Sequence, residues 1–172
     1  MAKINSIPDA SGANFLDYTP FTGSSEWLGT TFTSTVFVTV VEVNGEGYLE
    51  GVTAICSNSG VSALLRVTLD GSVIFLAKTN GSSSYGTGVV NSKNLHSNPT
   101  AGAGINSVTA ASRSGPINYA VSLPHNPGEA SALDGVFSII DFLKFSSSLK
   151  IELKLTSSGG ANLAVEYHGG VK

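Results

Sequence analysis

The chain has 172 residues, of which 41% are hydrophobic and 12% charged, and its formal net charge is −3. This length suits one domain with a core of its own, because a chain of this size buries about 70% of the surface that it exposes when unfolded. The lysines and arginines form no basic stripe, which argues against a nucleic-acid-binding surface, and no segment has the roughly 18 apolar residues of a membrane span.

The low charge indicates contact with other protein chains. An average soluble domain carries about 25% charged residues, whereas here Ser, Thr, Asn and Gly take their place. Because charge repulsion keeps monomers apart, we expect much of this surface to meet other protein. The alternative is a neutral, Ser/Thr-rich surface of an ordinary β-protein.

Residues 1–29 are predicted to form an extended N-terminal arm, and residues 30–172 a single β-domain. The arm shows no regular alternation and contains several Pro and Gly residues, and it has no apolar stretch that indicates a signal peptide. Its four aromatic residues are candidate interface anchors, since aromatic side chains are enriched among the residues that dominate binding energy. They are Phe15, Tyr18, Phe21 and Trp27. The residues alone leave open whether these rings pack on their own domain or on a neighbouring subunit.

From Thr30 onward the composition is typical of β-strands, with runs of Val, Thr and Phe separated by Gly-, Asn- and Asp-containing turns. Strands are predicted at 32–43, 48–57, 63–69 and 73–78. The Asp70-Gly71 pair between the last two strands is the strongest hairpin signal in the chain.

Residues 79–115 are rich in Gly, Ser and Asn. A structureless insert of that length is unusual in a compact domain, so we expect one or two short strands inside it, near 88–91 and 105–111. A further strand is predicted at 116–123.

Residues 136–145 fit two patterns. Val136, Ile139, Ile140 and Leu143 fall at helical spacing, yet the segment is short and rich in β-branched and aromatic residues. A strand with a bend is the favoured prediction.

The C-terminal part alternates most clearly, which predicts two strands that each bury one face. The residues predicted to point inward are Leu149, Ile151, Leu153, Leu155, Leu163, Val165 and Tyr167. If the two strands pair as a hairpin, Glu166 faces Lys150, Glu152 or Lys154.

About eight strands with no clear helix predict an all-β fold, an antiparallel β-sandwich. A jelly roll is the favoured form, because two sheets of four strands fit the length.

No catalytic constellation is visible, so we expect no enzymatic activity, no cofactor and no metal. His96, His125 and His168 have no short metal-ligand spacing, and Glu42, Glu46 and Glu50 read as a solvated hairpin end. Cys56 sits in an apolar run and is expected to be a buried structural thiol.

Three segments carry a resemblance to a known group of proteins: residues 47–52, residues 65–71 and residues 145–153. With a glycine-led strand, a strand that ends in Asp-Gly and a late Phe-x-x-x-Leu-x-Ile strand, the chain resembles small accessory virion structural proteins of tailed bacteriophages. That resemblance implies a β-sandwich that decorates capsids, forms head fibres or sits on tails, often as a homotrimer. It concerns strands and turns, so no functional residue is carried over.

Two functions are therefore expected from the sequence. The first is a non-enzymatic virion structural protein, made in the host cytoplasm, that forms a homo-oligomer (a trimer is favoured) and docks on other virion proteins of a capsid or tail. The alternative is a receptor- or glycan-binding module at a phage tail tip or on a cell surface. Neither involves nucleic acid or a membrane.

Overall fold

A computed structural model describes the chain over residues 18–26, 32–56, 60–79, 85–91, 118–120, 126–132, 135–139 and 142–172. Within these ranges the regular structure is β-strand, apart from one short 3-10 turn, η3 (Glu129–Ser131). The strands are β1 (Thr19–Glu26), β2 (Val38–Asn44), β3 (Gly47–Cys56), β4 (Ala63–Leu69), β5 (Ser72–Lys78), β6 (Tyr85–Asn91), β7 (Asn118–Ala120), β8 (Gly135–Ile139), β9 (Leu143–Phe145), β10 (Ser148–Leu155) and β11 (Leu163–Val171).

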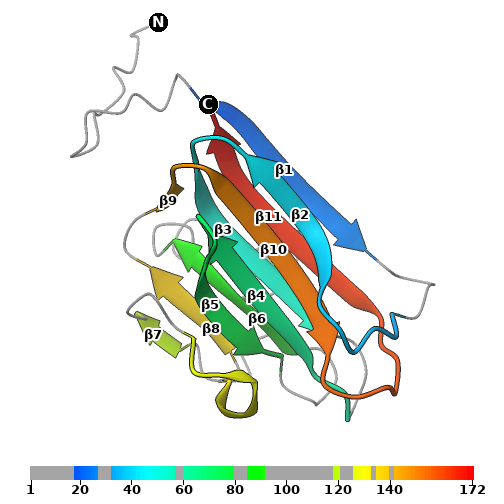
Figure 1. The fold of residues 1–172 in the computed structure, drawn as a ribbon. Helices are drawn as coiled ribbons and strands as arrows, with labels where there is room; N and C mark the ends of the chain where they lie inside the picture. Colours follow the sequence, from blue (N-terminus) through cyan, green and yellow to red (C-terminus); the bar gives the residue numbers. More distant parts are fainter. Residues whose placement is uncertain are drawn as a thin grey trace, which may run out of the picture.

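The strands form two sheets that pack face to face (Figure 1). The seven-stranded sheet has the order β1-β11-β3-β6-β8-β7, with β9 paired to the start of β3, and the four-stranded sheet has the order β2-β10-β4-β5. Strand β8 runs parallel to β6 and β7, and the other pairs are antiparallel. The predicted all-β sandwich is confirmed.

The turn between β4 and β5 is the predicted two-residue hairpin. Leu69 pairs with Ser72, and the two residues between them have positive φ angles, 49° at Asp70 and 79° at Gly71. A type I′ turn requires positive φ at both central residues, which Asp and Gly tolerate better than other residues. The hairpin prediction is therefore confirmed at the level of the backbone.

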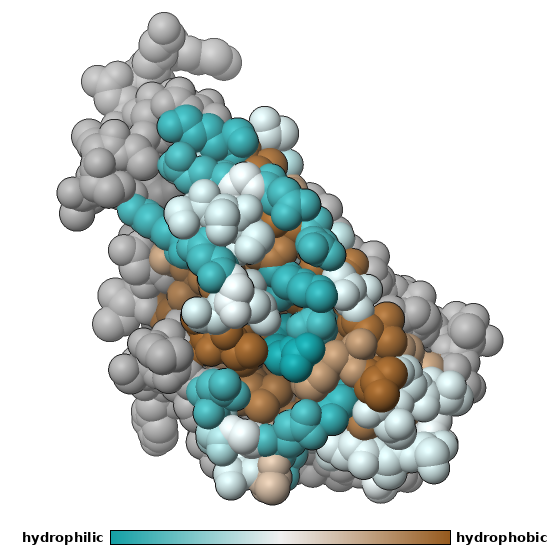
Figure 2. Space-filling view, in the orientation of Figure 1, coloured by the Kyte–Doolittle hydropathy of each residue, from teal (hydrophilic) through white to brown (hydrophobic). Residues whose placement is uncertain are grey.

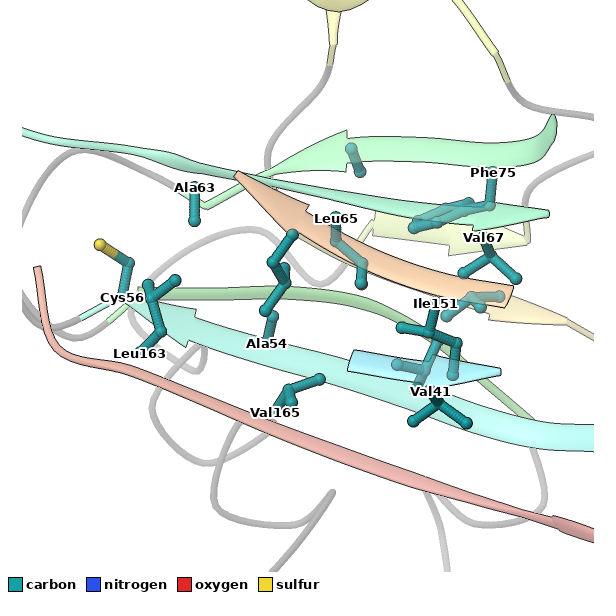
Figure 3. Close-up of a cluster of buried hydrophobic side chains, with 14 of the residues drawn as sticks. Val41, Ala54, Cys56, Ala63, Leu65, Val67, Phe75, Ile151, Leu163 and Val165 are labelled. Atoms are coloured by element: carbon teal, nitrogen blue, oxygen red, sulfur yellow. The ribbon is translucent and has the colours of Figure 1, made fainter. Parts of the chain in front are cut away.

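The core lies between the two sheets, where apolar side chains from both meet (Figure 3). All six predicted aliphatic residues of β10 and β11 are buried, with at most 1% of their surface exposed; these are Leu149, Ile151, Leu153, Leu155, Leu163 and Val165. Tyr167 is half-buried and packs against the same core. Cys56 is buried as expected, with its thiol donating to the carbonyl of Val61 at 3.4 Å.

The suggested hairpin between the two C-terminal strands is wrong. Strand β10 lies between β2 and β4 in the four-stranded sheet, whereas β11 lies between β1 and β3 in the other. Both strands bury an apolar row, so they contribute to the core from opposite sheets. In consequence Glu166 lies opposite Thr53 in register, and Glu152 lies opposite Arg66.

Part of the predicted N-terminal arm is a strand of the domain. Strand β1 pairs with β11 along its whole length, from Thr19 opposite Val171 to Glu26 opposite Ala164. An edge strand is held by main-chain hydrogen bonds, which need no alternation of apolar and polar side chains. The β-domain therefore starts well before residue 30. The first seventeen residues of the predicted arm lie outside the described part of the chain.

The remaining strand predictions have mixed outcomes. The strand expected near 88–91 is present as the longer β6, while the one expected near 105–111 lies outside the described residues. Of the strand predicted at 116–123, the structure describes only the three residues of β7. Residues 136–145 are confirmed as strand where the structure describes them, because 136–139 belong to β8, which pairs with β6, and 143–145 form β9, which pairs with β3. Residues 140–141 lie outside the described part of the chain, so the bend stays a prediction.

Candidate functional site

One end of the sandwich, where β9 and the C-terminus lie in Figure 1, gathers four separate segments. They are the residue before β1, the β2–β3 turn, the β4–β5 turn and the β9–β10 turn. Main-chain hydrogen bonds join the three turns to one another and to the C-terminus. Gly45 donates to Ser147 at 2.8 Å, Asp70 to Ser148 at 2.9 Å, and Lys172 to Glu46 at 2.9 Å.

The carboxylate of Asp70 holds the β9–β10 turn in place. It accepts hydrogen bonds of 2.7–3.1 Å from the backbone N–H groups of Ser146, Ser147 and Ser148. The hydroxyls of Ser146 and Ser147 add bonds of 3.0 and 2.8 Å. These donors, the backbone of Ser146 first, hold the pKa of Asp70 well below its usual range. A carboxylate has about four acceptor positions, so the acceptor capacity of Asp70 is used within the protein.

Aromatic side chains lie beside Asp70 and the β9–β10 turn that it holds. Tyr18 donates its hydroxyl to Oε1 of Glu46 at 2.8 Å, and its ring meets Tyr48 edge-on at a centroid distance of 5.4 Å. The ring centroid of Tyr48 in turn lies 5.2 Å from the ring centroid of Phe142. Burial, and after it the charge of Glu50, raises the pKa of Tyr48, so its hydroxyl stays protonated. Tilted and edge-on contacts are favourable for aromatic rings.

The four segments enclose a shallow pocket of about 290 Å³. Its lining consists of Tyr18, Glu46, Gly47, Asp70, Lys144, Phe145 and Ser146. Gly47 is required there, because any side chain at this position would collide with the ring of Phe145 and with the carbonyl of Gly170. The pocket thus combines an aromatic wall with charged groups of both signs.

Two of the four candidate interface anchors lie in the described part of the chain. Tyr18 lines the pocket, and Phe21 on β1 is half-buried above Gly169, with its ring centroid 6.4 Å from that of Tyr167. Both therefore contact their own domain. Phe15 and Trp27 lie outside the described residues, and the interface role of the four residues stays a prediction.

The outer face of the four-stranded sheet carries a network of ion pairs, and Figure 2 shows hydrophilic and hydrophobic residues side by side there. Glu152, only 5% exposed, binds Nε of Arg66 at 2.7 Å and Nζ of Lys150 at 3.4 Å. Burial opposes ionisation of Glu152, but the hydrogen bond and charge of Arg66, aided by Lys150, hold its pKa below the usual value. The guanidinium of Arg66 also lies 3.7 Å from the centre of the Phe37 ring.

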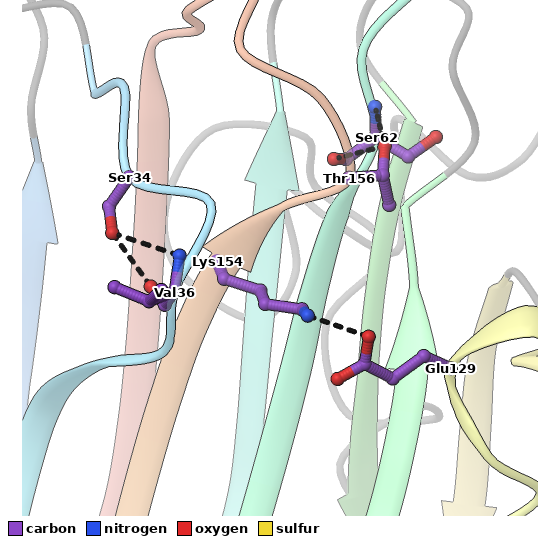
Figure 4. A network of polar contacts seen from close by, with 6 residues as sticks. All are labelled: Ser34, Val36, Ser62, Glu129, Lys154 and Thr156. Atoms are coloured by element: carbon purple, nitrogen blue, oxygen red, sulfur yellow. Dashed lines mark hydrogen bonds and ion pairs between the residues drawn. The ribbon is translucent and has the colours of Figure 1, made fainter.

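The segment 126–132 crosses part of this outer face. Lys154 on β10 binds Oε2 of Glu129 at 2.6 Å (Figure 4). Ala132 is buried in a small apolar cluster with Leu64 and Leu76, away from the main core. One ion pair and one small apolar contact thus attach an otherwise exposed segment to the sheet.

Two valine side chains at and just before the start of β2 are exposed to solvent. Among the described residues, the large apolar side chains exposed to solvent are Val36, at 70%, and Val38, at 37%. Strand β2 is an edge of the four-stranded sheet. The hydroxyl of Ser34 donates to the carbonyl of Val36 at 2.7 Å and accepts from its N–H at 3.3 Å (Figure 4). This local turn fixes Val36 in its exposed position.

The sequence predicted neither the hydrogen bonds of the Asp70 side chain nor the exposed valines before β2. The Asp-Gly pair identified the hairpin, but nothing marked the Asp70 side chain as an acceptor for a serine run 76 to 78 residues away. The strand predicted from residue 32 includes Val36, whereas β2 begins at Val38. The bend at Thr35 and Val36, between Phe32 and that strand, has no Gly or Pro to indicate it.

Within the described ranges, no three His, Cys, Asp or Glu side chains are grouped so that they could hold a metal ion. Those ranges also contain no helix that is long and apolar enough to span a membrane. His168 lies on β11, and the other two histidines lie outside the described residues.

Comparison with protein-family models and with curated proteins found no match for this chain.

Proposed function

We propose that this chain is a non-enzymatic structural protein of a bacteriophage particle, which assembles with copies of itself and docks on capsid or tail proteins. The strand order supports a jelly roll as its scaffold. The pairs β1–β11, β2–β10, β3–β6 and β4–β5 are those of one long hairpin of eight strands rolled into two sheets. Jelly rolls of this kind form many viral capsid domains.

The observation that carries the proposal is the apolar edge of the four-stranded sheet. Natural proteins protect edge strands with Lys, Pro or a covering segment, because an open edge pairs readily with another chain. Strand β2 contains neither Lys nor Pro, and the exposed Val36 and Val38 stand at its start.

The occupant of this edge is a second copy of the chain. In a closed trimer each subunit uses two different surfaces. The edge at Val36 and Val38, here called the valine edge, therefore meets a different face of the next subunit. The low overall charge, 12% of residues, favours such contacts because little repulsion opposes them. The candidate anchors Phe15, Tyr18, Phe21 and Trp27 belong to the same proposal as further contacts.

Light scattering on the purified full chain tests self-assembly. We expect a trimer for the natural sequence and a shift toward monomer for the double variant Val36→Lys, Val38→Lys. Ser72→Lys is the matched control, since Ser72 is exposed at the start of a different edge strand and should leave the assembly intact. A natural chain that is monomeric at tens of micromolar would overturn the proposed assembly.

The virion role is tested separately, by mass spectrometry of purified phage particles. Detection at a fixed copy number per particle, as a multiple of three, is the expected result. Absence from purified particles would refute the proposed location, whatever the oligomeric state in solution.

A further inference from the structure

We infer that the pocket between Tyr18, Glu46 and Lys144 binds a neutral carbohydrate and accommodates a single sugar ring. This binding activity goes beyond the structural role proposed above and does not depend on it. It gives the alternative function considered from the sequence, glycan recognition, a site on the molecule.

The size of the pocket sets the scale of the ligand. Its volume of about 290 Å³ lies just below the roughly 300–1,000 Å³ that is typical of small-molecule sites. That space holds one pyranose ring and excludes anything much larger, while a longer glycan would extend from the open side into solvent.

The charges of the lining favour a neutral ligand. Asp70 already accepts hydrogen bonds from the three successive serines, so it shapes the wall but has no acceptor position left. Glu46 and Lys144 carry opposite charges, and with Asp70 the lining holds two carboxylates and one ammonium group. An anion would meet two carboxylates, and a hard cation such as Ca²⁺ would need six to eight oxygen ligands.

The polar and apolar groups match the two kinds of surface that a sugar presents. A hydroxyl both donates and accepts, so it can donate to Glu46 while a neighbouring hydroxyl accepts from the ammonium of Lys144, which has three donors. The ring of Tyr18 offers an apolar wall for the C–H face of the sugar. Binding sites of small ligands combine aromatic walls with a few placed polar groups in this way.

The site is formed before any ligand binds. The hydroxyl of Tyr18 holds Glu46 at 2.8 Å, and the ring of Tyr18 is supported from behind by Tyr48. The turns that carry the lining are joined by backbone hydrogen bonds of 2.8–2.9 Å. Preorganisation of this kind reduces the entropy lost on binding.

The test is saturation-transfer NMR and calorimetry on the full chain with methyl glycosides of glucose, galactose, mannose and N-acetylglucosamine. We expect at least one to bind with a Kd near millimolar. The variants Glu46→Gln, Lys144→Met and Tyr18→Phe should each weaken binding about tenfold, since hydrogen bonds to charged groups are the stronger ones. The controls Glu42→Gln and Lys78→Met lie outside the pocket and should bind like the natural chain.

A second arm compares each bound glycoside with an oligosaccharide that ends in the same residue. Tighter binding of the oligosaccharide assigns the pocket to the end of a surface glycan, and equal binding assigns it to the single sugar. The inference is overturned if no glycoside binds, or if binding is unchanged in the three pocket variants. Light scattering on the Glu46→Gln and Lys144→Met samples keeps the two proposals apart, because these two variants change neither Val36 and Val38 nor a candidate interface anchor.

Discussion

Leu153 offers the sharpest test of how the core is built. Its side chain is fully buried on β10, where it lies in register between Val38 of β2 and Leu65 of β4. Replacing it with Ala removes buried methylene groups and leaves a cavity between the two sheets. Such Leu-to-Ala changes in protein cores cost about 2–5 kcal/mol, depending on how far the surroundings collapse into the space.

The neighbours of Leu153 place the expected cost within that range. Leu65 is itself fully buried and is held between β10 and β5, so it cannot move into the cavity. Val38 is 37% exposed on the edge strand, so it can shift inward and fill part of it. We therefore expect Leu153→Ala to lower the free energy of unfolding by about 3 kcal/mol, in the lower half of the range of about 2–5 kcal/mol.

Urea denaturation followed by circular dichroism measures this loss, at one fixed protein concentration because assembly adds to apparent stability. The matched control is Thr39→Ala, an exposed position on β2 that should change stability by about 0.5 kcal/mol or less. A loss below about 1 kcal/mol for Leu153→Ala, with an unchanged m-value, would refute the assigned core, since it falls under the range for buried leucine.

Three further predictions concern other parts of the fold. Asp70→Asn should destabilise the protein at neutral pH. The pKa of Asp70 in the folded protein lies below its unfolded value of about 3.9, so the stability that its carboxylate contributes is present above that value and is lost as the pH falls. The melting temperatures of the natural chain and the variant should therefore converge in acid. Arg66→Ala should cost about 1–3 kcal/mol in urea denaturation, because it leaves the buried carboxylate of Glu152 with only the weaker Lys150 contact; a loss no larger than that of an exposed Lys would contradict this. Deleting residues 1–17 keeps β1 and should leave circular dichroism unchanged while sedimentation shows weaker assembly; unaltered assembly would show that these residues take no part in it.

The sequence by itself determined the class of fold and the inward face of each C-terminal strand. Both follow from local patterns: alternation with a period of two shows which side of a strand is buried, and an Asp-Gly pair tolerates the positive φ angles of a tight hairpin. Leu149 to Leu155 and the turn at Asp70 are therefore as predicted. The β-branched and aromatic residues of 136–145 also indicated strand rather than helix, as β8 and β9 confirm.

Only the tertiary structure decided which strands pair. Alternation in β10 and β11 shows that each strand buries one face. The same alternation results whether the two strands share a sheet or face each other across the core. The strands lie in opposite sheets. Strand β1 had no pattern to reveal it, because main-chain hydrogen bonds to β11 hold an edge strand whatever side chains it carries.

The candidate sites depend even more on the fold. Tyr18, Glu46, Asp70 and Lys144 come from four segments spread over most of the chain, and no short-range signal links a tyrosine, two turns and a serine run. They meet because the strand pairing brings one end of β1, β3, β4 and β10 to the same end of the sandwich. The sequence supplied the chemistry of each group, and the strand pairing alone placed those groups within reach of one another.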